Sequence, residues 1–93
     1  MAKKRVRVYY SGSVQGVGFR FTAERVANQL DLVGWVKNLV DGGVEVVCEG
    51  EESKLREFLD KIKNGPLKHY IRNADVSWSE ATEEFKAFEI RFW

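Results

Sequence analysis

The stretch from residue 11 to residue 20 combines the residue types from which proteins build a phosphate site. It reads Ser-Gly-Ser-Val-Gln-Gly-Val-Gly-Phe-Arg, with three glycines and no carboxylate. Glycines let the backbone curl so that successive N–H groups can face one concavity, and an arginine offers a planar fork for two phosphate oxygens. A helix that starts directly after the loop adds the positive end of its dipole. The predicted anion cradle consists of Gln15, Gly16, Val17, Gly18, Phe19 and Arg20.

Glycine-rich loops are common, so a plain connection with an arginine on the surface is the alternative. Two better-known phosphate motifs are absent from this loop. It has no Gly-Lys-Ser/Thr ending, and Gly16-Val17-Gly18 is followed by Phe21 where a dinucleotide fingerprint needs a third glycine. We therefore expect no nucleotide cofactor.

The composition of the loop restricts the chemistry that it can support. With no acid beside the phosphate, a leaving group must depart without a proton, which suits a carboxylate whose conjugate acid has a pKa of about 4. A mixed anhydride of phosphoric and carboxylic acids is then a better substrate than a phosphate ester. No activated nucleophile is visible, so water is the expected attacking group.

Asn38 is the candidate for orienting that water. An amide in the middle of an apolar strand is unfavourable by propensity, and its side chain can both accept from and donate to a water molecule. It cannot take the proton, which would pass most simply to a phosphoryl oxygen with a second pKa of about 6. The alternative is that Asn38 is an ordinary strand-end residue beside a turn.

Hydrophobic periodicity predicts the elements that position these residues. Apolar residues recur at helical spacing from Phe19 to Leu30 and from Leu55 to Ile62, and Asn64-Gly65-Pro66 ends the second helix. Asp41-Gly42-Gly43 predicts a hairpin turn. Alternating or β-branched segments predict strands over residues 5–11, 34–40, 44–49, 70–79 and 88–93.

This order predicts a single domain over residues 1–93 with an α+β, ferredoxin-like fold. It is β-α-β-β-α-β with an added C-terminal strand, and two right-handed crossovers put both helices on one face of a mostly antiparallel sheet. Such a fold hosts both enzymes and RNA binders, so it fixes no function by itself.

Composition excludes several classes of protein. Fifteen Lys and Arg oppose fourteen Asp and Glu, a net charge of +1, which disfavours a general nucleic-acid or membrane-surface binder. No apolar run resembles a signal peptide or membrane helix, so a cytoplasmic protein is expected. Cys48 is expected to be a buried, inert thiol and His69 an exposed residue, and neither has partners for a metal site. No cofactor is expected, and no apolar stripe demands a partner, so a monomer is expected.

An RNA-binding or protein-interaction module without activity is the alternative function. Tyr9, Trp35 and Trp93 can share the open face of the sheet, where aromatic rings stack on bases, and residues 16–21 faintly resemble an RNA-recognition motif. That motif belongs on a strand, however, whereas here it precedes a helix.

Two spaced patterns resemble the signatures of the acylphosphatases. The first is Gly-x-Val-Gln-Gly-Val-x-Phe-Arg over residues 12–20. The second is Gly-Trp-Val-Lys-Asn-x-x-x-Gly-x-Val over residues 34–44, with a further glycine at residue 50. Both stand in the expected order and separation, and the similarity covers nearly the whole chain. Tyr10 departs from the pattern, which prefers an aliphatic residue there, and residues 66–80 match only loosely.

The resemblance implies metal-free hydrolysis of acyl phosphates to a carboxylate and inorganic phosphate. It implies that Arg20 binds the phosphate, that Asn38 positions the attacking water and that backbone amides from Gln15 to Arg20 form the cradle. Inorganic phosphate is then a product and is expected to inhibit competitively.

Overall fold

The computed structural model describes residues 2–92 and contains two α-helices and five β-strands. The strands are β1 (Lys3–Gly12), β2 (Val33–Asn38), β3 (Val44–Glu51), β4 (Ile71–Glu80) and β5 (Phe88–Arg91). The helices are α1 (Phe19–Gln29), α2 (Glu52–Asn64) and the short 3₁₀ turn η1 (Lys68–Tyr70).

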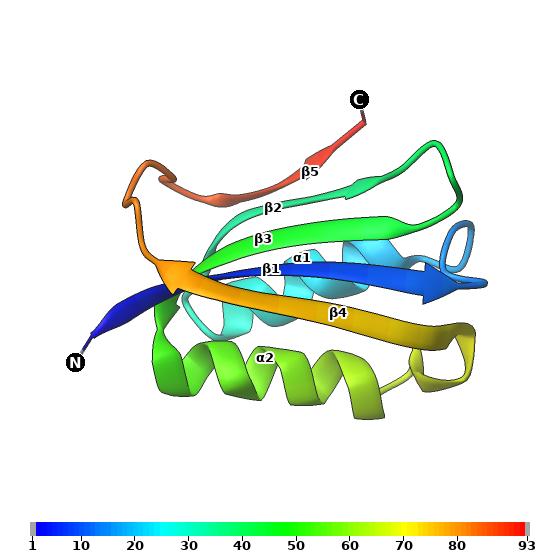
Figure 1. Ribbon diagram of the computed structural model, residues 1–93, viewed down its shortest axis with the longest axis horizontal. Helices are drawn as coiled ribbons and strands as arrows, with labels where there is room; N and C mark the ends of the chain where they lie inside the picture. The colour runs from blue at the N-terminus through cyan, green and yellow to red at the C-terminus, as the bar shows by residue number, and fades with distance from the viewer. Residues whose placement is uncertain (1, 93) are drawn as a thin grey trace.

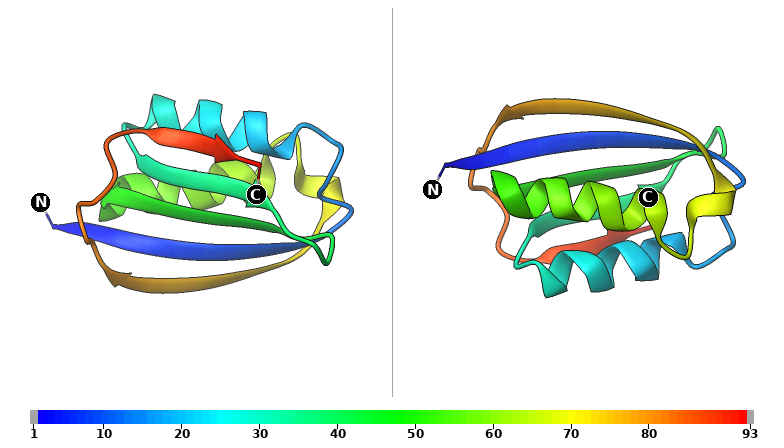
Figure 2. Two further views of the ribbon diagram at one scale, coloured as in Figure 1. Left: turned by 90° about the horizontal axis from the view of Figure 1, so that it is seen from above. Right: turned by 90° about the horizontal axis from the view of Figure 1, so that it is seen from below.

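The strands form one sheet in the order β4-β1-β3-β2-β5. Every neighbouring pair is antiparallel except β2 and β5, which are parallel. Both helices pack on the same face of this sheet (Figures 1 and 2). The predicted fold class is therefore confirmed, and the added C-terminal strand lies beside β2 at the sheet edge.

The core lies between the sheet and the two helices. In β1 the side chains of Val6, Val8 and Tyr10 are buried, and they alternate with more exposed neighbours as the sequence predicts. The helices contribute their apolar faces to the same cluster: Phe19, Ala23, Val26 and Ala27 from α1, and Leu55, Phe58 and Ile62 from α2. This packing fixes the C-terminal ends of β1 and β2 and the start of α1 at one end of the molecule (Figure 1).

Strand ends differ from the predicted ones by at most two residues. The prediction continued the second strand to residue 40, but β2 ends at Asn38 because the N–H of Leu39 donates to the carbonyl of Gly43 and closes the turn. The prediction ended the last strand at Trp93, which lies outside the described residues, whereas β5 ends at Arg91. The turn η1 was not predicted.

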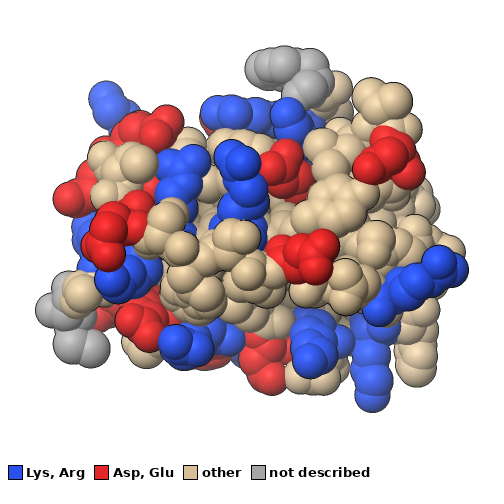
Figure 3. Space-filling view, viewed as in Figure 1, with Lys and Arg blue, Asp and Glu red and all other residues tan. Residues whose placement is uncertain are grey.

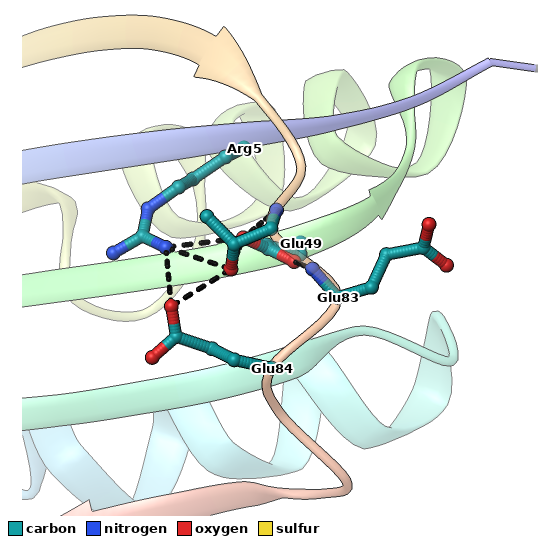
Figure 4. A network of polar contacts seen from close by, with 5 residues as sticks. Arg5, Glu49, Glu83 and Glu84 are labelled. Atoms are coloured by element: carbon teal, nitrogen blue, oxygen red, sulfur yellow. Dashed lines mark hydrogen bonds and ion pairs between the residues drawn. The ribbon is translucent and has the colours of Figure 1, made fainter.

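The end of the sheet farthest from the start of α1 is closed by a buried carboxylate (Figure 4). Glu49 alternates with inward-facing residues of β3, yet it is only 2% exposed because the connection from β4 to β5 covers it. Its oxygens accept hydrogen bonds from the N–H groups of Thr82 and Glu83, the Thr82 hydroxyl and the Arg5 guanidinium. Burial alone raises the pKa of Glu49, but these donors outweigh it and hold that pKa below its ordinary value.

We predict that Glu49→Gln lowers the free energy of unfolding by about 2 kcal/mol at pH 7, because it loses charge-assisted hydrogen bonds to buried donors. The stability that the depressed pKa contributes is complete above the ordinary glutamate value of about 4.3 and is lost as the pH falls through the folded-state value. Urea unfolding should therefore show a difference between variant and wild type that shrinks below about pH 4.

Glu84→Gln is the matched control, since Glu84 reaches the same Arg5 from an exposed position. A loss of stability as large as that of Glu49→Gln would contradict the burial argument.

Candidate active site

The predicted cradle lies in the connection between β1 and α1. Gly16 and Gly18 both have a φ close to +80°, in the left-handed region that favours glycine, and Gly18 is the residue from which α1 starts. The side chains of Val14 and Phe19, on either side of this turn, are buried in the core. The loop therefore has two fixed ends and a tightly curled middle.

The backbone N–H groups of this loop are unusual in having no acceptor. Within residues 2–92, none of the N–H groups from Val14 to Phe21 donates to another protein group, and no side chain caps the helix. The hydrogen-bonded backbone resumes on both sides, where Ser13 donates to Tyr70 and Thr22 donates to Gly18. A run of free donors at a helix start attracts an anion.

A cavity of about 200 Å³ opens beside this loop. It is lined by Val14, Gly16, Gly18, Phe19, Arg20, Phe21 and Asn38. The structure thus brings Arg20 and Asn38, 18 residues apart in the sequence, to one cavity together with three other members of the predicted cradle. None of the lining side chains is a carboxylate.

The side chains of Gln15 and Val17, also in the predicted cradle, do not line the cavity. The Gln15 amide donates to the carbonyls of Leu39 and Gly43, at 2.7 Å and 2.9 Å, and so joins the loop to the turn between β2 and β3. Val17 packs against the core. Their side chains hold the loop in place. Only their backbone N–H groups can therefore contribute to the predicted cradle.

Asn38 is the last residue of β2 and is half-buried. Its side-chain oxygen is buried and has no hydrogen-bond partner within the described chain. A buried acceptor without a donor costs stability, and nearly all such groups in folded proteins are paired with protein or water. Asn38 also lines the cavity, which makes its side chain a candidate partner for a small molecule bound there.

Arg20 is half-buried at the rim of the cavity. Its guanidinium carbon lies 4.8 Å from the centre of the Phe92 ring, within the range of a cation–π contact. Among residues 2–92, no carboxylate lies within ion-pair distance of it, so its donors remain available to an anion. The C-terminal carboxylate of Trp93 lies outside the described residues.

Sequence reasoning missed the cavity residues Val14 and Phe21 and the neighbouring Phe92. Val14 and Phe21 flank the predicted cradle by one residue on each side, so a wider window would have included them. Phe92 is the residue directly after Arg91, which pairs with Lys37 at the end of the β2–β5 ladder. Its only sequence signal is the alternation of Phe88, Ile90 and Phe92 in the last predicted strand.

The other candidate residues play no part in this cavity. Cys48 is buried, and burial raises the pKa of its thiol, while His69 is exposed on η1, as predicted for each. Among the residues that the structure describes, no three His, Cys, Asp or Glu side chains are grouped to hold a metal ion. No described helix is long and apolar enough to span a bilayer.

Comparison with known proteins agrees with this geometry. Residues 6–90 match the sequence model of the family described as Acylphosphatase. The chain belongs to the acylphosphatase family. It is 42% identical over 87 residues to the acylphosphatase of Archaeoglobus fulgidus, covering 94% of this chain and 97% of that one. It is 39% identical over 89 residues to that of Salinibacter ruber, covering 96% and 94%.

Solved structures lead to the same family. The crystal structure of acylphosphatase from Bacillus subtilis superposes with a TM-score of 0.88 and 38% sequence identity, covering 95% of this chain and 98% of that one. The family and the enzyme class predicted from the two sequence patterns, an acylphosphatase, are confirmed by these matches.

We predict that Gln15→Leu destabilises the acylphosphatase fold by about 1 to 2 kcal/mol, because two carbonyls lose their donor while the side-chain volume is kept. The freed turn should also lower the affinity for inorganic phosphate. Thermal unfolding and a phosphate titration followed by NMR measure the two effects. Gln29→Leu, at an exposed position of α1, is the control. Equal behaviour of the two variants would rule out a stabilising role for the Gln15 hydrogen bonds to the turn.

Proposed function

We propose that this acylphosphatase holds the phosphoryl group of its substrate with Arg20 and the loop amides, and holds the attacking water with Asn38. The observation that carries the proposal is that Asn38 lines the same cavity as Arg20, and that its side-chain oxygen is buried with no partner among residues 2–92. Steady-state hydrolysis of benzoyl phosphate by the wild type, compared with the variants below, tests it.

The phosphate would be bound by donors that have no competing acceptor. The unpaired N–H groups from Val14 to Phe21 and the start of α1 provide partial positive charge, and Arg20 adds a full charge with a fork for two oxygens. Donors fixed before the substrate arrives need no reorganisation as charge develops on the phosphoryl oxygens.

The hydrolysis step requires one water molecule. Its oxygen forms a bond to phosphorus while the bond from phosphorus to the acyl oxygen breaks, and that electron pair leaves with the carboxylate. The water proton passes to a phosphoryl oxygen, so an acyl phosphate dianion and water give a carboxylate and dihydrogen phosphate. Asn38 accepts a hydrogen bond from this water and orients it without taking its proton.

The leaving group explains why no acid is needed. A carboxylate is stable without a proton at neutral pH because the pKa of its acid is about 4, whereas an alkoxide is not. The cavity offers no carboxyl or imidazole group that would protonate an alkoxide. This composition supports acyl phosphates as substrates rather than phosphate esters.

We also propose that residues 1–93 act as one monomeric domain in the cytoplasm. The RNA-binding alternative has less support than the enzyme, because Lys and Arg side chains are interspersed with Asp and Glu on the face seen in Figure 3. A binder of nucleic-acid backbones usually gathers its basic residues into one patch.

Arg20→Lys keeps the charge but loses the two-pronged contact with phosphate. We expect kcat/KM for benzoyl phosphate to fall about 100-fold, and the constant for competitive inhibition by inorganic phosphate to rise in parallel. Arg25→Lys, an exposed position on the same helix, controls for the exchange. Near-normal kinetics of the Arg20 variant would remove this residue from the site.

Asn38→Ala removes the group that orients water but none of the groups that bind phosphate. We expect kcat to fall on the order of 100-fold, with little change in inhibition by phosphate. Asn28→Ala, at an exposed site on α1, is the control. A folded Asn38 variant with wild-type turnover would disprove the water-positioning role.

A further inference from the structure

Two large apolar side chains are exposed beside Arg20. Phe21 is 67% exposed and lines the cavity, and Phe92 is 72% exposed with its ring 4.8 Å from the Arg20 guanidinium carbon. Single exposed apolar residues are ordinary, but two exposed aromatic rings beside an arginine that lines a cavity indicate a contact surface.

The sheet register sets Phe92 beside Asn38 as well. β2 and β5 are parallel, with Val36 opposite Ile90 and Lys37 opposite Arg91. The next residue after each member of this last pair is Asn38 in one case and Phe92 in the other. Strand alternation puts both of them on the face that carries Val36 and Ile90. The register therefore sets Phe92 opposite Asn38, which lines the cavity, while Phe21 lines it from the first turn of α1.

The small size of the cavity favours an acyl group that extends toward these rings. About 200 Å³ is less than the roughly 300 to 1,000 Å³ of pockets that enclose a drug-sized ligand. With the phosphoryl group bound by the loop, a bulky acyl group extends away from the loop amides and toward the opening of the cavity. Phe21 lines the cavity and is largely exposed, and Phe92 is exposed against the Arg20 guanidinium.

We propose that Phe21 and Phe92 form an acyl-group subsite that takes flat, apolar acyl groups, such as an aromatic acyl phosphate, in preference to small ones. This rests on the proposed function, because the phosphate cradle orients the substrate. Offset or edge-to-face packing against the two rings supplies the preference. Phe92 in addition keeps the Arg20 guanidinium plane beside its ring.

The decisive measurement is the ratio of kcat/KM for benzoyl phosphate to kcat/KM for acetyl phosphate. We expect this ratio to fall roughly 10-fold in Phe21→Ala and in Phe92→Ala, since the aromatic contact serves only the larger acyl group. Both side chains are exposed, so circular dichroism should show folded variants. An unchanged ratio in both variants would overturn the subsite, even where the two rates fall together.

Phe85→Ala is the matched control. Its ring also lies over an arginine, with the Arg5 guanidinium carbon 5.4 Å from its centre, but it belongs to the connection between β4 and β5 and does not line the cavity. The ratio should not change in this variant.

A second measurement separates failure of the subsite from failure of the proposed function. Phenylphosphonate and methylphosphonate bind without being hydrolysed, and NMR titration gives their affinities. The wild type should prefer phenylphosphonate, and Phe21→Ala should lose that preference; equal affinities in the wild type would overturn the subsite. If a folded wild type hydrolyses neither acyl phosphate, the proposed function fails, and the phosphonate pair still decides the aromatic contact.

Discussion

The site depends on a run of backbone N–H groups that the fold keeps without acceptors. From Val14 to Phe21 no backbone N–H group donates to an acceptor within the described chain, and the last three of these groups lie in the first turn of α1, where a helix supplies no partner. The loop holds this arrangement because Val14 and Phe19 are buried on either side of it. Under the proposed function, an anion bound beside the loop would accept hydrogen bonds from these N–H groups.

The turn between β2 and β3 is the second fixed part of the site, and it is held by the strand that leads into the loop. The Tyr9 hydroxyl of β1 donates to Asp41, and Asp41 accepts the N–H of Gly43. These two donors hold the pKa of the Asp41 carboxyl below its ordinary value, and the Tyr9 hydroxyl has the larger effect. Together with the Gln15 amide, they fix the place where β2 ends, and Asn38 is the residue at that end.

Local sequence patterns predicted the local features of the structure, namely its helices, its strands and the two motifs of the candidate site. The two glycine-containing signatures located Arg20 and Asn38, which the structure brings to one cavity, and periodicity predicted both helices and all five strands. Contacts between distant segments were not predictable in this way. Glu49 is buried by residues more than thirty positions later in the chain, and Phe92 is brought near Arg20 only because β5 pairs with β2. Alternation assigns a face to each residue but not the segment that covers it.

Tyr10 shows how a departure from the family pattern is accommodated. Its ring is buried and lies 4.8 Å from that of Phe19, measured between ring centres, so it supports the residue that fixes the far end of the loop. Its hydroxyl has no partner within the described residues, and burial raises its pKa. An aliphatic residue would avoid that unpaired hydroxyl but would give up the aromatic contact. Tyr10 therefore leaves a buried hydroxyl without a partner among residues 2–92, but its ring packs against Phe19 at the end of the loop between β1 and α1.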